Sequence, residues 1–388
     1  MKQLPAISNI SEKRVAYLST YPPRECGIAT FTKDLLDAAN ELNALKPPAV
    51  IALNEKETIY NYDKRVKWQI ERDCVDDYVQ AARFANSSDV DLVNIQHEFG
   101  LFGGEYGDYI NHFLDNVEKP VVTTLHTVQP NFDPKAKAVL RRIAAKSASI
   151  VVIARLAIEL LEKQGIVCKK VAVIPHGCPD IPFVPSEIVK ASLGLKDRFV
   201  LSTFGLISRG KGIEYAIRAL PYVIDKEPRI IYLIIGETHP EVRKTEGENY
   251  RKKLMRLVEE LHLEKHVRFH NRFLTKRELI KYLQATDVYL TPYTSPNQIS
   301  SGPLVYALGT GRAVISTPYL HAQEVLAGGQ GLFCKFKDAN SVAACIEKLL
   351  DENLRWAMQR KAYKYSRKFV WSNVAKEYLK LFKRIIKS

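Results

Sequence analysis

The sequence predicts an α/β protein with two doubly wound, Rossmann-like domains that face each other across a deep cleft. Three observations favour this fold class. The chain has 388 residues, a length that suits two typical domains. Short apolar runs alternate with helical stretches from end to end, as in parallel sheets whose strands are joined by crossover helices. The runs are nearly continuous in Val, Ile and Leu, which is typical of strands buried on both faces.

Each half of the chain carries six strand-like runs. In the first half they cover residues 15–19, 50–53, 92–96, 121–125, 150–153 and 171–174. In the second half they cover residues 199–204, 230–235, 267–269, 288–290, 313–316 and 332–334. Ligands of open parallel sheets bind beyond the carboxyl ends of the strands, so the segments that follow these runs are the candidate sites.

The boundary between the domains is predicted where Pro179, Pro182 and Pro185 interrupt regular structure. We expect a first domain over residues 1–185 and a second over residues 195–369. The last helix, residues 370–388, has no strand of its own to cover, so we expect it to cross back and complete the first domain. Its apolar residues follow helical spacing and are Val374, Tyr378, Leu381, Phe382 and Ile385.

The composition is that of a globular protein, with 46% hydrophobic and 26% charged residues. Residues 1–13 contain no continuous apolar run, so no signal peptide is predicted. No stretch of about 18 apolar residues occurs, so no membrane-spanning helix is predicted either. The six cysteines are scattered, which in a chain without a secretion signal indicates reduced thiols and a cytoplasmic protein.

The formal net charge of +14 has two interpretations. It fits a solvated basic surface, or it attracts phosphate-bearing ligands or the anionic inner face of a membrane, where contact would be peripheral. The basic clusters lack the interleaved aromatic residues of a nucleic-acid platform, so no nucleic-acid partner is expected.

Three segments of the first domain are candidate ligand contacts. Gly27 begins a helix after the first strand and would let an anion approach backbone N–H groups, although it could be a simple turn glycine. The third strand leads into a polar, glycine-containing stretch whose candidate contacts are His97, Glu98, Gly103 and Gly104. The fourth strand ends at His126, whose imidazole we expect to point into the cleft, although strand-end histidines are often structural.

Two segments of the second domain could hold phosphate. Residues 205–212 nearly match the phosphate loop Gly-x-x-x-x-Gly-Lys-Ser/Thr, but Gly212 replaces the hydroxyl that would hold Mg²⁺, which argues against a P-loop ATPase. Arg209 and Lys211 still place two cations at a strand-to-helix turn, ready for a diphosphate. Small residues just ahead of a later helix form a second anion cradle, and they are Ser300, Ser301 and Gly302.

No metal site is predicted. His262, His266 and His270 recur every four residues, but residues 267–269 are strand-like, so the three imidazoles cannot share one helical face. No Asp-x-Asp follows a strand to carry a divalent ion.

In order and spacing, these motifs resemble the family 4 retaining glycosyltransferases of the GT-B fold. The resemblance covers nearly the whole chain and includes the glycine loop after the first strand, His126, and residues 173–177, 205–212 and 304–311. It implies that the second domain binds the diphosphate of a nucleotide sugar, such as a GDP- or UDP-hexose, and that the first domain binds the acceptor. The hexose would be mannose or glucose, and the acceptor a sugar or a lipid-linked sugar.

The resemblance also implies residue roles. Lys211 matches the family's diphosphate lysine, and Arg209 stands near the family's arginine, whose place holds Leu206. The amides around Ser301 and Gly302 match the donor-phosphate loop, and His126 matches a histidine close to the transferred sugar. The reaction would retain anomeric configuration and use neither a metal nor a further cofactor.

The sequence departs from the family at two glutamates eight positions apart, which are replaced by Gln298 and Tyr306. Both positions are still candidate donor contacts. Gln298 can hydrogen-bond sugar hydroxyls, but Tyr306 cannot accept a bidentate pair from ribose as a carboxylate does. Two alternatives therefore stay open beside the transferase: a retaining phosphorylase that uses inorganic phosphate and a sugar 1-phosphate, and a non-catalytic protein that binds a sugar or a nucleotide.

Overall fold

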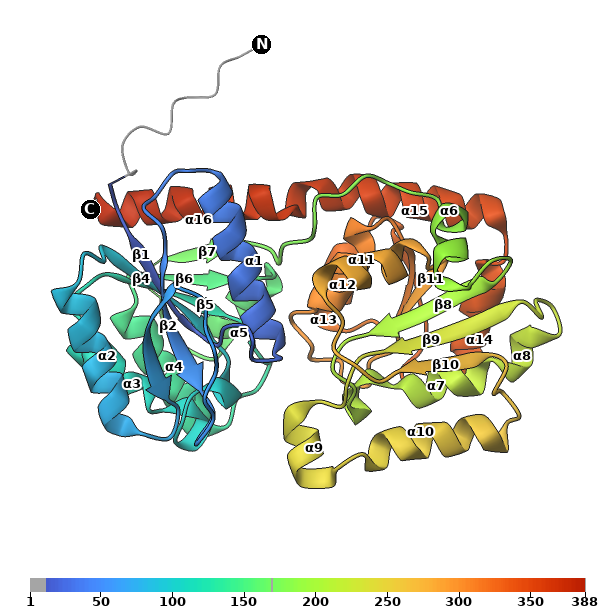
Figure 1. Cartoon of the computed structure of the whole chain (residues 1–388), viewed down its shortest axis with the longest axis horizontal. Helices are drawn as coiled ribbons and strands as arrows, with labels where there is room; N and C mark the ends of the chain where they lie inside the picture. The colour runs from blue at the N-terminus through green and yellow to red at the C-terminus, as the bar shows by residue number, and fades with distance from the viewer. Residues whose placement is uncertain (1–11, 169, 388) are drawn as a thin grey trace, which may run out of the picture. The chain divides into compact units, whose positions relative to one another are not determined.

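A computed structural model describes residues 12–168 and 170–387, which form two compact units (Figure 1). Of the described residues, 12–168, 170–177 and 371–387 belong to the first unit, and 178–370 belong to the second. Most of the opening stretch 1–13, for which no signal peptide is predicted, lies outside the described residues. Among the helices that are described, none is long and apolar enough to cross a membrane.

In the described residues, the first unit contains a seven-stranded parallel sheet in the order β3-β2-β1-β4-β5-β6-β7. The strands are β1 (Val15–Ser19), β2 (Ala49–Asn54), β3 (Val66–Glu71), β4 (Leu92–His97), β5 (Val121–Leu125), β6 (Ser149–Val152) and β7 (Val171–Val173). The chain winds outward in both directions from β1 and β4, so the doubly wound prediction is confirmed for this unit. Such a switch point is where open parallel sheets bind ligands.

The prediction of six strands in the first half was wrong by one, because β3 was missed. Its sequence, VKWQIE, alternates apolar and polar residues, and only Ile70 is fully buried. The strand lies at the sheet edge beside β2 and has one wetter face, so it lacks the continuous apolar run of a central strand. The other predicted strands are present, with ends shifted by a residue or two.

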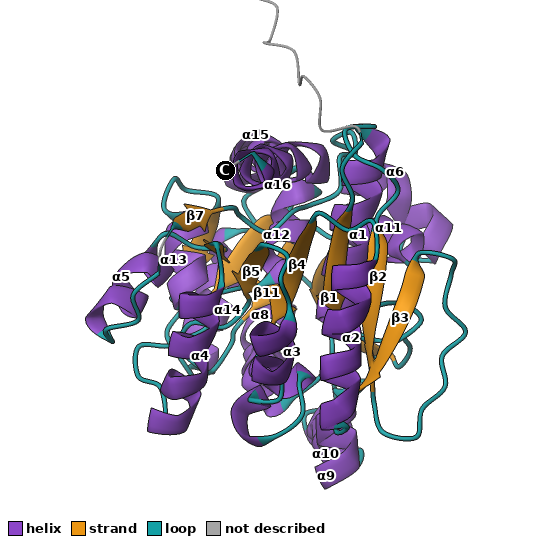
Figure 2. Ribbon diagram, turned by 90° about the vertical axis from the view of Figure 1, so that its left-hand side faces the viewer, coloured by secondary structure: helices purple, strands orange, loops and turns teal. Residues whose placement is uncertain are grey.

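Helices cover both faces of the first sheet. They are α1 (Gly27–Glu41), α2 (Val75–Ser87), α3 (Ile110–Asn116), α4 (Pro134–Lys146), α5 (Leu156–Lys163) and α16 (Trp371–Ile386). Figure 2 shows α2, α3 and α4 side by side across one face. On the other face α1 and α16 share a hydrophobic cluster with side chains of β1, β2, β4, β5 and β6.

The last helix packs on the first unit, as predicted. All five apolar residues identified by their spacing are buried in α16. Phe382 packs edge-on against Tyr17 of β1, with ring centroids 6.4 Å apart, and the hydroxyl of Tyr378 lies 3.0 Å from Thr124 Oγ1 of β5. An amphipathic stripe at helical spacing thus completes the core of the first sheet.

The second unit contains, within its described residues, a six-stranded parallel sheet in the order β10-β9-β8-β11-β12-β13. The strands are β8 (Phe199–Phe204), β9 (Ile230–Ile235), β10 (Val267–His270), β11 (Val288–Thr291), β12 (Ala313–Ser316) and β13 (Gly331–Phe333). The helices are α6 (Ser186–Lys190), α7 (Ile213–Ala219), α8 (Pro221–Ile224), α9 (Pro240–Glu246), α10 (Asn249–Glu260), α11 (Lys276–Gln284), α12 (Gly302–Gly309), α13 (Leu320–Leu326), α14 (Ala339–Lys348) and α15 (Glu352–Ser366). All six predicted strands are found.

Buried polar contacts tie the proline-rich segment after Cys178 to the second unit. The fully buried guanidinium of Arg312 donates to the carbonyl of Val184 at 2.9 Å. The ammonium of Lys190 lies 2.7 Å from Asp287, whose carboxylate also accepts the Val200 amide at 2.7 Å. These contacts explain why the chain divides at Gly177–Cys178, ahead of the prolines, and not within them.

Candidate functional site

The ends of β4 and β5 bring His126 and Gln96 together in the first unit. His126 Nε2 lies 2.9 Å from Gln96 Oε1. The amide of Gln96 donates to Asn94 Oδ1 at 2.5 Å, and Asn94 donates to the carbonyl of Val122 at 3.0 Å. Because this chain of donors turns the Gln96 oxygen toward the imidazole, Nε2 carries the proton and Nδ1 is left as a hydrogen-bond acceptor.

His126 is electrically neutral. Burial lowers its pKa to about 3, with further contributions from His176 and His97. Its ring packs edge-on against Phe31 of α1, with 4.7 Å between centroids. A neutral imidazole in a fixed orientation at a strand end can accept a hydrogen bond from a hydroxyl, but it cannot serve as a cation.

The structure corrects the prediction that His97 contacts the acceptor. The side chain has no exposed surface, and its ring stacks on Phe102, with 5.5 Å between centroids. Neither ring nitrogen has a hydrogen-bond partner among the described residues. Burial lowers the pKa of His97 to about 3. His97 is therefore a neutral part of the core beneath the loop, with no surface to offer a ligand.

Glu98 is a carboxylate without a cationic partner in the described part of the chain. One oxygen accepts the hydroxyl of Thr127 at 2.5 Å, and the other accepts the Phe99 amide at 3.0 Å. Burial raises the pKa of Glu98, and the two hydrogen bonds oppose this shift. A half-buried carboxyl group held at the ends of β4 and β5 can accept further hydrogen bonds from hydroxyl groups.

The three predicted glycines of the first unit fall into two classes. A Cβ at Gly103 would lie 2.0 Å from the carbonyl of Arg72, and one at Gly104, where φ is +79°, would lie 1.9 Å from Asp108. Close packing within the loop thus accounts for both without a ligand. Gly27 is different because it is exposed, at the start of α1, and nothing lies within 4 Å of its Cβ position.

In the second unit, three strand ends converge on Lys211. The loop after β8 leads into a short 3-10 helix, Arg209–Lys211, that ends at Gly212 with a φ of +62°. A Cβ at Gly212 would lie 2.1 Å from the carbonyl of Pro292 after β11, and one at Gly236 after β9 would lie 2.1 Å from the carbonyl of Gly205. The glycines therefore let three loops approach one another closely.

The ammonium of Lys211 lies against Tyr293, which follows β11. Its Nζ donates to the Tyr293 hydroxyl at 2.7 Å and lies 4.4 Å from the centroid of that ring. Within residues 12–168 and 170–387, no carboxylate forms an ion pair with Lys211. Burial would raise the pKa of Tyr293, but the charge and hydrogen bond of Lys211, together with hydrogen bonds of Ser301 and Thr291, lower it. The lysine charge is therefore available to an anion.

Arg209 differs from Lys211 because its charge is already paired. Its guanidinium donates to Glu246 at 2.9 Å and 3.1 Å, and about half of its side chain is exposed. It also lies 5.5 Å from the centroid of the Tyr250 ring. Arg209 would have to leave Glu246 to contact a diphosphate, so the structure distinguishes the two predicted cations.

The predicted second anion cradle offers fewer open backbone N–H groups than the sequence indicates. The amide of Ser301 donates to His321 Nδ1 at 2.9 Å, and the Leu304 amide donates to the Ser301 hydroxyl at 3.4 Å. Pro303 has no N–H. In the described structure, Gly302 is thus the residue at the start of α12 whose amide stays open to an anion.

The side chains at the two departures from the family's glutamates behave differently. Gln298 is exposed, and its amide donates to the carbonyl of Ser300 at 2.5 Å. Tyr306 is buried on α12 in the hydrophobic cluster that contains Phe204 and Tyr289. Tyr306 is therefore a core residue, and the predicted donor contact at this position is not supported by its surroundings.

Sequence reasoning left three neighbours of these side chains without a role: Thr127, Tyr293 and His321. Tyr293 could have been found by the signal used for the other candidates, since it directly follows a strand. His321 lies 20 residues beyond Ser301 on α13, and no local pattern indicates that its Nδ1 faces that amide.

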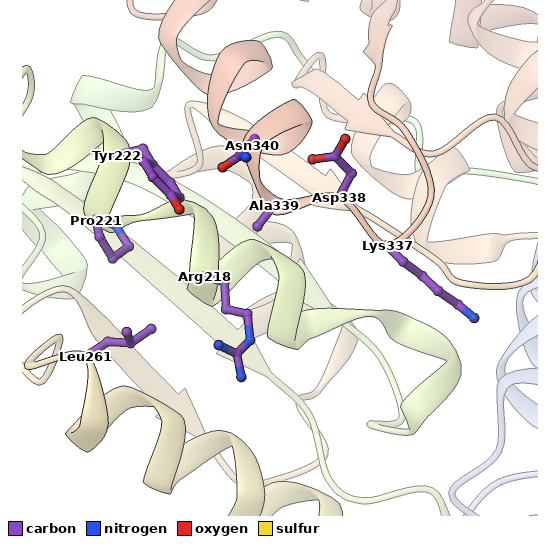
Figure 3. A pocket seen from close by; sticks show the side chains of 8 residues that line it. All are labelled: Arg218, Pro221, Tyr222, Leu261, Lys337, Asp338, Ala339 and Asn340. Carbon is purple, nitrogen blue, oxygen red and sulfur yellow. The ribbon is translucent and has the colours of Figure 1, made fainter.

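A surface hollow of about 620 Å³ lies elsewhere in the second unit (Figure 3). It is lined by Arg218 and Tyr222 of α7 and α8, Leu261 at the end of α10, and residues 337–340 at the start of α14. None of the predicted site residues lines it. Among the described residues, no three His, Cys, Asp or Glu side chains gather as ligands for a metal ion.

Residues 186–369 match the family Glycosyl transferases group 1. An uncharacterized glycosyltransferase of Methanocaldococcus jannaschii is 27% identical over 199 residues, which cover 49% of this chain and 46% of the relative. A D-inositol 3-phosphate glycosyltransferase of Corynebacterium urealyticum is 28% identical over 229 residues, which cover 56% of this chain and 51% of the relative. The chain thus spans about half the length of the curated relatives it matches.

Solved structures match over nearly the whole chain. Sucrose-phosphate synthase from Thermosynechococcus elongatus gives a TM-score of 0.79 at 17% identity, covering 97% of this chain and all of that one. Anabaena HepE in complex with UDP and glucose gives 0.74 at 15% identity, covering 96% and 100%. These likenesses show the fold, that of GT-B glycosyltransferases. Within that fold, the match to the glycosyl transferases group 1 family covers residues 186–369, which belong to the second unit.

Proposed function

We propose that this protein is a retaining, metal-independent family 4 glycosyltransferase that moves a hexose, mannose or glucose, from a nucleotide diphosphate sugar to an acceptor. The observation that carries the proposal is Lys211, a cation without a carboxylate partner in the described structure, held where three strand ends converge. It lies inside the region that matches the glycosyl transferases group 1 family.

The proposed reaction breaks the bond between the anomeric carbon and the diphosphate oxygen. The new bond to the acceptor oxygen forms on the same face, and the acceptor proton passes to the departing phosphate. Negative charge grows on the leaving diphosphate, where the Lys211 ammonium and the Gly302 amide would stabilise it. No metal or further cofactor takes part in this scheme.

Two groups of the first unit would bind hydroxyls. His126 would accept a hydrogen bond through Nδ1 from the transferred sugar, because Gln96 holds Nε2. Glu98 would accept hydroxyls of the acceptor at the neighbouring strand end. Both roles need hydrogen-bond acceptors, which a neutral imidazole and a carboxyl group supply.

The names of similar proteins suggest which substrates to try first. HepE is described in complex with UDP-glucose, so UDP-glucose is the first donor. D-inositol 3-phosphate glycosyltransferase, sucrose-phosphate synthase and trehalose-6-phosphate synthase each carry a phosphorylated sugar or polyol in their names. We therefore propose a phosphorylated sugar or polyol as the first acceptor class, ahead of a lipid-linked sugar. We place the reaction in the cytoplasm, at the inner membrane face if the acceptor is lipid-linked.

A phosphorylase on the same scaffold is the second candidate, and the surroundings of Tyr306 favour it. With Tyr306 in the core and Gln298 bonded to Ser300, no carboxylate stands at either position to grip ribose. Inorganic phosphate or a sugar 1-phosphate would need only Lys211 and the Gly302 amide.

The test is thermal stability of the purified chain with UDP, GDP, ADP, inorganic phosphate and glucose 1-phosphate, since a ligand that binds only the folded state raises the melting temperature. The transferase predicts a shift with one nucleotide that disappears in Lys211→Ala and persists in Lys265→Ala, an exposed lysine of the same unit. A shift with phosphate or glucose 1-phosphate alone would favour the phosphorylase. Binding of a nucleotide sugar without turnover toward any acceptor would indicate a binding protein.

A further inference from the structure

We infer that Tyr293 is a positioning residue that holds the Lys211 ammonium ready for the donor diphosphate. The inference rests on the proposed function, in which Lys211 binds that anion. It adds a residue that lies outside the glycine-rich segment 205–212. Tyr293 follows β11 and is 82 positions further along the chain than Lys211.

The first step of the argument is that Tyr293 is itself immobile. Its side chain is 5% exposed, and its ring stacks on Tyr319 with centroids 5.1 Å apart and planes 14° apart. Its carbonyl accepts the Thr317 hydroxyl at 2.6 Å, and the Tyr319 hydroxyl lies 3.1 Å from Thr291 Oγ1. A ring fixed on these sides can fix whatever it contacts.

The second step is that Lys211 needs such a partner. A lysine has a flexible four-carbon stem, and immobilising it costs up to about 2 kcal/mol of rotamer entropy. The Tyr293 hydroxyl at 2.7 Å and its ring at 4.4 Å confine the ammonium before an anion arrives. A Cβ at Gly205 would lie 3.3 Å from the same ammonium, so the loop backbone borders it as well.

The third step is that Tyr293 positions the charge without cancelling it. Glu246 pairs with Arg209 through its carboxylate. A carboxylate partner of this kind would neutralise the charge of Lys211 and compete with phosphate for it. A phenol uses one of the three ammonium protons and leaves the positive charge and two donors for the ligand. Because no carboxylate in the described residues forms an ion pair with Lys211, its contact with Tyr293 leaves the lysine charge unpaired.

The experiment compares Tyr293→Phe with Tyr232→Phe, using inorganic pyrophosphate as the probe because it needs no base recognition. Tyr293→Phe keeps the stacked ring and removes the hydroxyl. Tyr232→Phe is the matched control, since it removes another buried hydroxyl of the same unit, one that bonds Thr203 at 2.7 Å. Melting without ligand confirms that each variant folds, and isothermal titration gives the affinity and the fraction of sites that bind.

Loss of a hydrogen bond to a charged group should weaken pyrophosphate binding by Tyr293→Phe about tenfold or more, at an unchanged number of sites. Tyr232→Phe should bind as the wild type does. A purely structural role would instead reduce the number of binding sites at unchanged affinity, and that result would overturn the inference. The inference about Tyr293 would also be overturned if Tyr293→Phe bound pyrophosphate with wild-type affinity while Lys211→Ala lost binding. That result would still support the proposed anion site at Lys211. Wild-type binding by Lys211→Ala would overturn both proposals.

Discussion

His97 offers the sharpest test of the electrostatics of the first unit. Its imidazole is wholly buried, has no hydrogen-bond partner among the described residues, and has a pKa lowered to about 3. In the unfolded chain a histidine titrates near pH 6.5. Between pH 6.5 and 3 the unfolded state binds a proton at this histidine and the folded state does not. The free energy of unfolding is therefore highest above about pH 6.5 and decreases as the pH falls toward 3.

The replacement His97→Phe removes this proton and keeps an aromatic ring against Phe102. A group that ionises only in the unfolded state favours unfolding by about 2 kcal/mol at pH 5.0 and by almost nothing at pH 7.5. The loss of unfolding free energy between these two pH values should therefore be about 2 kcal/mol smaller in His97→Phe than in its parent. The pKa of His126 is lowered mainly by burial, with His97 as the smallest of three causes, so His126 contributes about equally to both proteins.

The assay is urea unfolding followed by tryptophan fluorescence in a Trp356→Phe background. Trp68 and Trp371 belong to the first unit and Trp356 to the second, so this background reports the first unit alone. His112→Gln is the control, because that imidazole is exposed and stays hydrated in both states. Equal pH dependence in His97→Phe and its parent would refute the reasoning, because it would mean that the buried ring takes up a proton as readily as an unfolded one.

Three further predictions concern the second unit and are checked by urea unfolding. Gly212→Ala should cost about 2 kcal/mol or more and also weaken pyrophosphate binding, since φ is +62° and the new Cβ would lie 2.1 Å from the Pro292 carbonyl; wild-type values for both would contradict this. Asp287→Ala should lower the free energy of unfolding by about 3–5 kcal/mol, because Lys190 stays buried without its partner. The control Asp351→Ala, at an exposed helix cap, should lower it by only about 1 kcal/mol. Tyr306→Glu should cost about 3 kcal/mol or more without improving nucleotide affinity, since position 306 is core; tighter UDP binding would show that it faces the ligand.

Much of the fold could be predicted from the sequence because its signals are local. Twelve of the thirteen strands in the described residues follow apolar runs, and the apolar stripe of α16 follows helical spacing. The glycine-lysine segment 205–212 pointed to Lys211 because it directly follows a strand, and open parallel sheets bind ligands beyond the carboxyl ends of their strands. The exception, β3, is an edge strand whose alternating side chains resemble an exposed segment.

The site depended on tertiary structure wherever side-chain direction decides it. Gln96 and His97 are neighbours on β4, and successive strand side chains point to opposite faces. Gln96 thus meets His126, while His97, which the sequence predicted as a ligand contact, enters the core. The pairing of Arg209 with Glu246 and that of Ser301 with His321 joins residues 37 and 20 positions apart through loop paths that carry no sequence period.

By itself, the sequence determined two parallel sheets, the helix that returns to the first, and a lysine at a strand-to-helix turn, because hydrophobic periodicity and glycine placement act over a few residues. Only the tertiary structure decided which candidate charges are free. Lys211 keeps its charge beside Tyr293, whereas Arg209 is paired with Glu246 and Tyr306 is packed in the core. The physical reason is that the availability of a charge depends on which distant side chains the packed sheets bring within hydrogen-bonding distance.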